Sequence, residues 1–196
     1  MALDFHTYLK AKNNYCYCYN GYYKEFIWQL LHVRKFAQKK FPNINIFISC
    51  VTEIADSINE DNVINANNFK NYFFLKTEEI CFDMVNNPIL KIMQDSKIEI
   101  NQATSLPLVG KTCAIINKTK NPFKSYNDLP KLESYLSKNW NVVPIEQAEV
   151  LFAVECEELY KWAYLGKQTV LINTENNQEI YKKLFPKNEI LNIKHI

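Results

Sequence analysis

The sequence predicts an α/β protein with parallel β-sheets and helices on both faces of each sheet. Short apolar runs such as Val150 to Val154 (VLFAV) alternate along the chain with segments of helical period. These runs are continuously apolar, which is typical of strands covered on both faces. Hydrophobic residues make up 47% of the 196 residues, enough to form a buried core.

The first elements predict a β-α-β unit. Tyr15 to Tyr19 (YCYCY) is rich in strand-forming residues and ends at Asn20-Gly21. A helix is expected from Tyr23 to Phe41-Pro42, because apolar residues recur there at spacings of three and four. The apolar run from Ile44 to Val51 predicts a second, buried strand.

The middle of the chain has weaker patterns. We expect a cap at Thr77, because Glu78 and Glu79 would lie in the first turn of a helix and complement its dipole. Pro88 then ends that helix or begins another. The remaining expected elements are a helix at Thr52 to Ile58 and strands at Asn62 to Asn65 and Lys97 to Ile100.

The second half alternates strands and helices more regularly. Gly166 is expected to end the helix that begins at Glu157. The expected strands are 112–117, 141–145, 150–154, 169–173 and 190–193, and the expected helices are 128–138, 157–165 and 177–184. The segment Gln102 to Gly110 has no helical period and contains Pro107. The sequence therefore predicts two Rossmann-like halves, residues 1–104 and 105–196.

Composition excludes several classes of function. Three glycines are too few for a glycine-rich phosphate loop. A net charge of +2 without a basic block argues against nucleic acid as a partner, and no apolar run reaches the roughly 20 residues that span a membrane. The six cysteines and three histidines share no metal-ligand spacing, so we expect no metal site. We also expect no cofactor, and we expect the cysteines to be free thiols in the cytoplasm.

Candidate ligand-binding residues follow the predicted strands, because ligands of open parallel sheets bind beyond the carboxyl ends of the strands. After the strand at 112–117, the loop offers three charges and two hydroxyls for phosphate oxygens, from Lys118, Thr119, Lys120, Lys124 and Ser125. The alternative is a solvated turn. After the strand at 150–154, the Glu155 carboxylate could accept hydrogen bonds from ribose hydroxyls, or it could help Glu157 and Glu158 to start a helix.

The first strand-to-helix turn supplies a third set of candidates. Asn20 and Gly21 form the turn, where glycine permits a positive φ or a close backbone approach. Glu25 is a candidate general base, although a carboxylate in a first helical turn also has a purely structural role. No G-x-S-x-G or other nucleophile motif is present, so the sequence gives no support to covalent catalysis.

Three stretches resemble heptosyltransferase-like GT-B glycosyltransferases. The stretch from Tyr17 to Ser49 is similar to the family's opening strand, glycine turn and long helix, with Phe41-Pro42 before the second strand. The stretch NKTKNPFKSYNDLPKLESYLSKNWNVVPI resembles the start of the family's C-terminal domain, where a basic loop precedes a helix and a strand. The stretch AEVLFAVECEELYKWAYLGKQTVLINT resembles a later strand and helix, with Ala163, Gly166 and Thr169 at its end.

The resemblance implies a reduced GT-B-like fold with a nucleotide-sugar donor held by the C-terminal half and an acceptor facing the N-terminal half. Lys120 would then lie near the donor phosphates, and Glu155 to Glu158 near the donor sugar or ribose. The family's D-S-G-x-x-H motif is replaced here by ECEELY, from Glu155 to Tyr160, and its G-D turn by Gly21-Tyr22. The chain is also shorter than a usual two-domain member.

Three functions follow from these observations. The first is a small glycosyltransferase-like protein that binds a nucleotide sugar or another phosphorylated small molecule and uses direct displacement. The second is a non-catalytic ligand-binding or protein-interaction domain that has lost the catalytic residues of the family. The third is a homo-oligomeric structural α/β protein.

Overall fold

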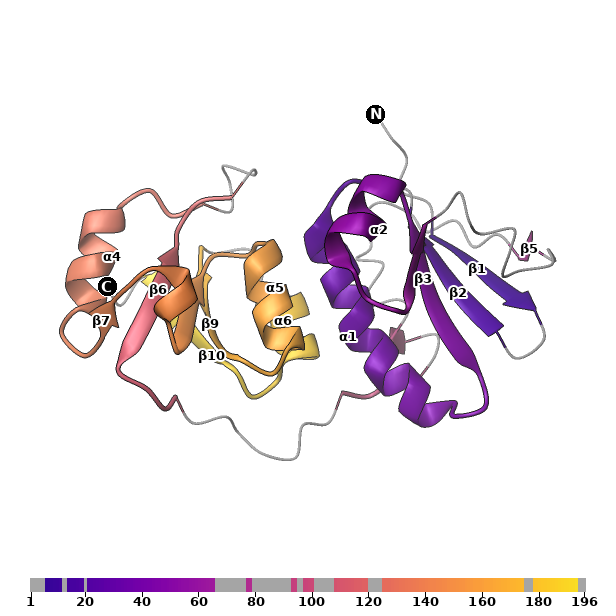
Figure 1. Cartoon of the computed structure of the whole chain (residues 1–196). Helices are drawn as coiled ribbons and strands as arrows, with labels where there is room; N and C mark the ends of the chain where they lie inside the picture. The colour runs from indigo at the N-terminus through magenta and orange to yellow at the C-terminus, as the bar shows by residue number, and fades with distance from the viewer. Residues whose placement is uncertain are drawn as a thin grey trace. The chain divides into compact units, whose positions relative to one another are not determined.

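The fold was analysed in a computed structural model that describes residues 6–11, 14–19, 21–65, 77–78, 93–94, 97–100, 108–119, 125–174 and 178–193. The chain divides into two compact units, Met1–Glu99 and Ile100–Ile196. The sequence placed this division between residues 104 and 105. Each unit contains its own sheet and is described by itself (Figure 1).

The sheet of the N-terminal unit has the strand order β4-β3-β2-β1-β5 within the described residues. Its parallel part consists of β2 (Asn14–Tyr19), β3 (Asn45–Cys50) and β4 (Val63–Asn65). The strand β1 (His6–Ala11) pairs antiparallel with β2 and with β5 (Thr77–Glu78). This sheet is therefore mixed, whereas the sequence predicted a parallel one.

Three further predictions for this unit are wrong or lie outside the described residues. The strand β1 was not predicted, because its polar residues hide the alternation of a strand. Thr77 and Glu78 belong to β5 instead of capping a helix, and Lys97 to Ile100 form a turn and irregular backbone instead of a strand. The helix break expected at Pro88 lies outside the described residues.

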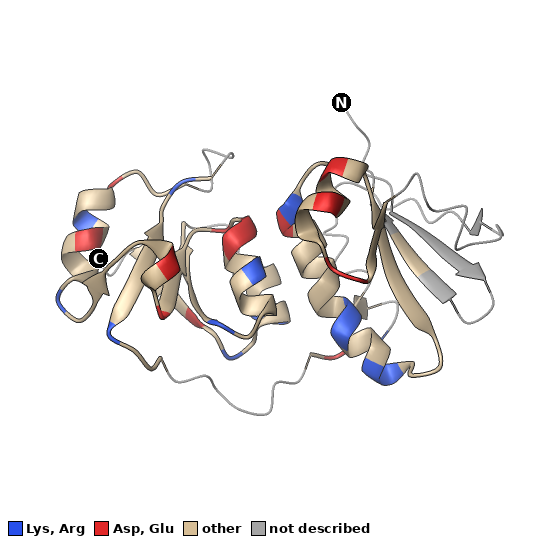
Figure 2. Ribbon diagram, in the orientation of Figure 1, with Lys and Arg blue, Asp and Glu red and all other residues tan. Residues whose placement is uncertain are grey.

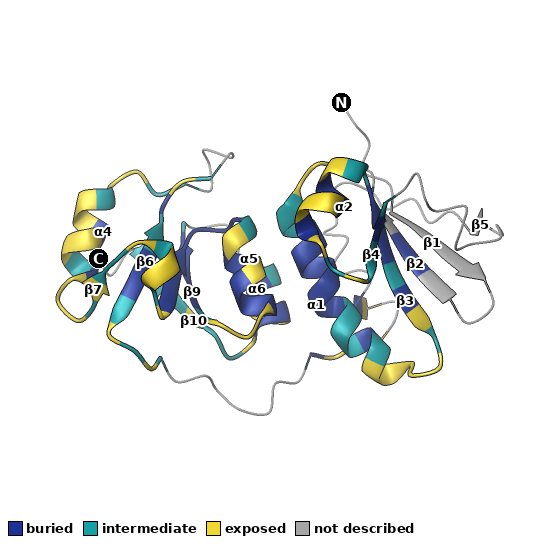
Figure 3. Cartoon of the chain, viewed as in Figure 1, coloured by how far each residue is buried: buried dark blue, intermediate teal, exposed yellow. Residues whose placement is uncertain are grey.

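The helices α1 (Lys24–Lys40) and α2 (Thr52–Ile58) of this unit have the bounds that the sequence predicts to within a few residues. In α1 the buried residues include the run from Ile27 to Val33, so the middle of the helix is covered all round (Figure 3). The helix α1 packs on β3, and α2 packs on β3 and β4.

The sheet of the C-terminal unit is parallel throughout and has the order β10-β9-β8-β6-β7. Its strands are β6 (Thr112–Ile116), β7 (Asn141–Val142), β8 (Val150–Ala153), β9 (Gln168–Asn173) and β10 (Glu189–Asn192). The chain adds β7 on one side of β6 and then β8, β9 and β10 on the other side. The order of addition therefore reverses between β6 and β8, which makes this pair a topological switch point.

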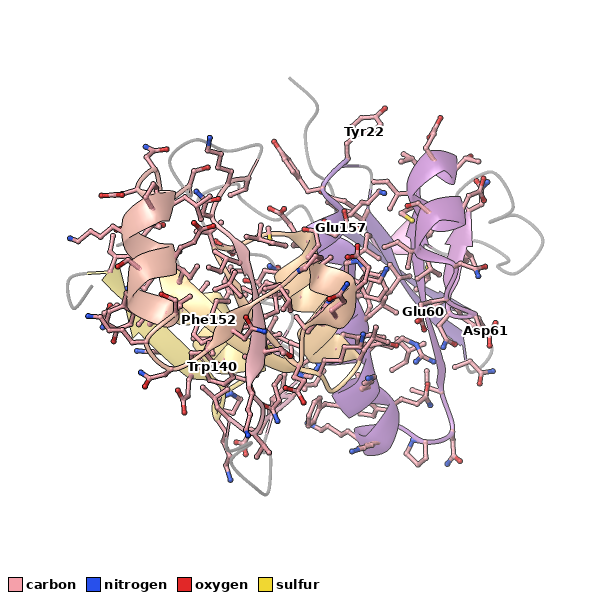
Figure 4. All side chains as sticks on the ribbon, turned by 60° about the vertical axis from the view of Figure 1, so that its left-hand side comes forward. Tyr22, Glu60, Asp61, Trp140, Phe152 and Glu157 are labelled. Atoms are coloured by element: carbon pink, nitrogen blue, oxygen red, sulfur yellow. The ribbon has the colours of Figure 1, made fainter. Side chains whose placement is uncertain are left out.

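Helices cover both faces of this parallel sheet, as the sequence predicts (Figure 1). Leu132 and Leu136 of α4 (Leu129–Leu136) pack with Val150 and Phe152 on one face. Trp140 adds an edge-to-face contact with Phe152, at 5.6 Å between ring centroids (Figure 4). The other face carries α5 (Glu157–Tyr164) and α6 (Gln178–Leu184).

The end of α5 confirms the expected role of Gly166. This glycine has a φ of +75°, and the N–H groups of Gly166 and Lys167 donate to the carbonyls of Ala163 and Trp162. These two hydrogen bonds are the arrangement by which a left-handed residue closes the last turn of a helix. Within the described residues, no helix has the length and apolar character needed to cross a membrane.

At the amino end of β6, the Glu149 carboxylate holds the start of the strand. Its Oε2 accepts hydrogen bonds from the N–H groups of Lys111 and Thr112, at 2.7 and 3.1 Å, and from the Thr112 hydroxyl at 3.0 Å. These three hydrogen bonds lower the pKa of Glu149 below its ordinary value of 4.5. The bond from the Lys111 N–H has the largest effect, followed by the two bonds from Thr112. Gly110, at a φ of +144°, leaves room for this carboxylate, because a Cβ there would lie 2.9 Å from Oε2.

We expect Glu149→Gln to lower the stability of the protein at neutral pH. Because the pKa of Glu149 is lowered in the folded state, its contribution is present above the unfolded pKa and is lost as the pH falls through the folded pKa. Urea unfolding of both proteins should therefore show a stability difference at neutral pH that disappears in acid. Glu146→Gln, at an exposed position in the neighbouring 3-10 helix, is the matched control and should show no difference. A difference that stays constant with pH would contradict this role for the carboxylate.

Candidate functional site

The candidate site lies at the carboxyl edge of the C-terminal sheet, where β6 and β8 end side by side. The two strands pair in parallel from Cys113↔Val150 to Ile116↔Ala153. The Val154 N–H then donates to the Ile116 carbonyl at 2.9 Å. Asn117 and Glu155 are the next residues along the two segments, so the turns after the two strands begin at the same edge of the sheet.

The structure brings most of the candidates in the C-terminal unit to this edge. Lys118 and Thr119 follow β6, Glu155 follows β8, and Glu158 lies in the first turn of α5. Lys118 and Glu158 are exposed, whereas Glu155 is only 4% exposed. Lys120, the residue on which the donor-phosphate expectation depended, lies outside the described residues.

The turn after β6 is closed at its base by hydrogen bonds. The Asn117 side-chain Nδ2 donates to the Tyr126 carbonyl at 2.8 Å, and the Tyr126 N–H donates to the Asn117 carbonyl at 2.7 Å. The Thr119 N–H also donates to the Ser125 hydroxyl at 3.1 Å. Asn117 is buried, and it thereby fixes where Lys118 leaves the sheet.

The turn after β8 contains a buried polar pair. The Tyr160 hydroxyl donates to Glu155 Oε1 at 2.9 Å, and both side chains are buried. Burial raises the pKa of the adjacent Cys156 thiol to about 12. Because a thiol with that pKa stays protonated at neutral pH, Cys156 is not an activated nucleophile.

The β8 side of this edge is acidic, whereas the β6 side carries both a cation, Lys118, and a carboxylate, Asp128. Glu157 and Glu158 begin α5 and offset the positive end of its dipole, which disfavours a phosphate there (Figure 2). Asp128 caps α4 by accepting a hydrogen bond from the Lys131 N–H at 3.1 Å. The cationic group of the described edge therefore stands on the β6 side, at Lys118.

The next two strands end in a polar pair; the sequence selects the loop from Asn173 to Asn177 as a candidate by its position, but it does not predict the contact with Asn192. The Asn173 Nδ2 donates to the Asn192 Oδ1 at 2.6 Å, where β9 and β10 finish in register. The signal available in the sequence was that an asparagine is the last residue of each of these two apolar strands. Tyr160 was missed as well, because helical spacing alone did not show that its ring turns inward.

The candidates in the N-terminal unit lie at the carboxyl end of β2. Gly21 is buried and Glu25 is half-buried in the first turn of α1, while Asn20 lies outside the described residues. The Tyr23 N–H donates to the Tyr19 hydroxyl at 3.2 Å, and the Tyr19 ring packs on Phe26. Tyr22 and Tyr23 are 70% and 60% exposed, and Tyr22 projects outward in Figure 4.

A concave region in this unit is acidic. A depression of about 340 Å³ lies between the end of α2 and β4, and Asp56, Glu60 and Asp61 contribute to its lining. Among the described residues, no group of three histidine, cysteine or acidic side chains is arranged to hold a metal ion. The described cysteines Cys16, Cys50, Cys113 and Cys156 are free and buried.

Comparison with known proteins gave a weak structural similarity. No family model and no curated protein matches the sequence. Among solved structures, the chain is similar to the bacterial iron-containing dodecameric glycosyltransferase TibC from enterotoxigenic E. coli, with 10% identity and a TM-score of 0.44. The match covers 79% of this chain and 56% of the other, so this chain spans little more than half of TibC. A similarity at that level carries no argument about function, and the function must be inferred from the geometry of the sheet edge.

We expect Asn117→Asp to destabilise the fold by about 1–3 kcal/mol, because a carboxylate cannot donate to the Tyr126 carbonyl and is buried beside it. Asn139→Asp changes the same atoms at an exposed position and should lie within about 0.5 kcal/mol of the wild type. Urea denaturation of the three proteins measures the difference. Equal stabilities for the two variants would show that Asn117 does not hold the turn.

Proposed function

We propose that the C-terminal unit binds the nucleoside diphosphate part of a nucleotide sugar, and that the protein is a small glycosyltransferase-like protein. The observation that carries this proposal is the parallel pairing of β6 and β8 at the topological switch point. Ligands of doubly wound sheets bind in the crevice outside the carboxyl ends of the strands at such a point. Here that edge offers both a cation and hydroxyl-binding groups.

The phosphates belong on the β6 side of the edge. Lys118 is exposed there and supplies a positive charge. On the β8 side, Glu157 and Glu158 would repel an anion. The charges therefore direct a bound diphosphate to the β6 side of the edge. Lys118 and Thr119 are its proposed contacts, and Lys120 is a further candidate contact.

The ribose belongs on the β8 side. A carboxylate accepts hydrogen bonds and donates none when ionised, so the carboxylates of this side suit hydroxyl groups and disfavour phosphate. Glu155 is the inner candidate, since it is buried and its Oε1 already accepts a hydrogen bond from Tyr160. The exposed Glu158, in the first turn of α5, is a second candidate acceptor at the rim of this sheet edge. This arrangement supports a sugar or ribose next to a phosphate, and not an isolated anion.

A transfer reaction at such a site would proceed by direct displacement. The acceptor hydroxyl forms the new bond to the anomeric carbon as the bond to the diphosphate breaks, and the nucleoside diphosphate leaves with the electron pair. The acceptor proton passes to a general base; the sequence offers Glu25 as a candidate, and the structure describes Glu25 only within the N-terminal unit. The protonated Cys156 thiol supports a mechanism without a thiolate nucleophile.

A binding protein without catalytic activity is the second candidate function. It is favoured by the segment from Glu155 to Tyr160, in which the Glu155, Cys156 and Tyr160 side chains are all buried. Tyr160 stands where the resembled family carries a histidine, and its hydroxyl bonds to Glu155. A protein of this kind would bind a nucleotide sugar without transferring the sugar.

We expect Lys118→Ala to weaken binding of a nucleoside diphosphate about tenfold or more, because a charge-assisted hydrogen bond to phosphate is lost. Isothermal titration calorimetry with UDP, GDP, ADP and CDP, and then with the corresponding nucleotide sugars, measures the affinity. Lys111→Ala is the matched control, since Lys111 is exposed at the opposite end of β6. Absence of heat with every ligand of this panel would refute the proposed site.

Turnover separates the two candidate functions. Release of nucleoside diphosphate from a bound nucleotide sugar is the result expected of a transferase. Binding without release under the same conditions is the result expected of the non-catalytic protein.

A further inference from the structure

We propose that the protein forms a two-fold dimer in which the β10 strands of two copies pair antiparallel and join their C-terminal sheets side by side. The partner that this surface fits is therefore a second copy of the chain. The contact uses the outer side of β10 and not the carboxyl edge of the sheet, so it does not depend on the proposed ligand.

The two outer strands of the C-terminal sheet differ in how well they are protected from pairing with another chain. On one side, β7 has only two residues, and Pro144 follows it closely. Short edge strands and prolines are devices that prevent such pairing. On the other side, β10 has four residues without a proline, and its one charged residue, Glu189, is the first. Among the described residues β10 pairs only with β9, so its outer side can accept a further strand.

The side chains of β10 also suit an interface. Ile190 and Leu191, at the centre of the strand, are aliphatic and half-buried. Leu191 and Ile193 pack against the core on the α4 face, and a neighbouring strand would cover the part of them that is still exposed. Joining a second strand here therefore removes apolar surface from water.

Symmetry selects a second copy in antiparallel orientation. A two-fold axis perpendicular to the sheet pairs β10 with itself antiparallel and gives a closed dimer. Pairing of β10 with β7 of another copy would be a head-to-tail contact, which two copies cannot close, and Pro144 opposes it. In the antiparallel pair the two Glu189 carboxylates lie at opposite ends, whereas a parallel pair would place them side by side.

The charges of α6 complement each other under the same axis. This helix packs on β9, the strand next to β10, and it exposes Glu179 in its first turn and Lys182 and Lys183 in its last turn. An axis perpendicular to the sheet keeps both α6 helices on one face and makes them antiparallel. The acidic turn of each helix then lies on the side of the basic turn of the other, and this charge complementarity favours a second copy over an unrelated strand.

Analytical ultracentrifugation of the full chain tests the dimer directly. The mass is measured from about 1 to about 500 µM, because an interface of this size is weak and transient. It should rise from the mass of one chain to twice that value and then stay constant. A single chain at every concentration overturns the inference. A mass that keeps rising beyond two chains also overturns it, because that is the result of head-to-tail pairing.

Charge-swapped variants test the antiparallel arrangement. Glu179→Lys makes both ends of α6 basic and should raise the dissociation constant of the dimer about tenfold. Adding Lys182→Glu and Lys183→Glu restores opposite charges, and the constant should return to within about threefold of the wild type. Glu133→Lys, at an exposed position of α4, is the matched control and should leave the constant unchanged. A dimer that Glu179→Lys does not weaken overturns the inference.

Hydrogen exchange locates the contact without any substitution. The backbone amides of β10 should exchange at least about tenfold more slowly at the highest concentration than at the lowest, whereas those of β7 should not change. A dimer in which the β10 amides exchange equally fast at both concentrations has its contact elsewhere, and that result contradicts the proposal.

Discussion

The parallel pairing of β6 with β8 is the constraint on which the candidate site depends. Because these strands are neighbours in space but are separated along the chain by α4 and β7, the pairing brings two unrelated turns to one edge. It also sends the following helices to opposite faces of the sheet. Were β7 placed between β6 and β8, the turns at Lys118 and Glu155 would be separated by a strand, and no switch point would exist there.

The layer beneath α5 and α6 shows how a polar group is kept inside an apolar environment. Burying a carboxylate is costly unless hydrogen bonds satisfy it, and Glu155 receives one from Tyr160. Tyr181 is buried in the same layer, and burial raises its pKa to about 12, so its hydroxyl stays a neutral hydrogen-bonding group. An apolar residue at position 155 would avoid this cost, so we expect the carboxylate to contribute less to stability than an apolar side chain of similar volume would.

The sequence was sufficient to predict most of the C-terminal unit because its patterns are local, but the strand expected at 141–145 ends at Val142 and Ile145 begins a 3-10 helix. The run VLFAV forms β8, Gly166 ends α5, and the strand ends locate the edge where the turns meet. The N-terminal unit was harder, since β1 owes its structure to antiparallel pairing with β2 and not to its own polar residues. Thr77 and Glu78 likewise form a strand only because β1 lies beside them.

The site could be predicted only as far as strand ends define it. Side-chain direction was out of reach: five of the eight residues of α5 are buried, so helical spacing could not separate Tyr160 from its neighbours as the one that faces Glu155. The same limit applied to Ser125, expected as a phosphate contact and found bonded to Thr119 at the base of its own turn.

The division of charge along the edge narrows the kind of ligand that the C-terminal unit can hold. A free phosphate would be attracted to Lys118 and repelled by Glu157 and Glu158, so it would use only one turn. A neutral sugar would meet the acceptors of the β8 side and gain nothing from the lysine. A molecule that joins an anionic group to a hydroxyl-bearing ring satisfies both turns at once, and the short separation of paired strands, about 4.8 Å, requires those two groups to be close together in it. A ribose carrying phosphate has that construction, and for this reason a nucleotide is the ligand that we propose for this edge.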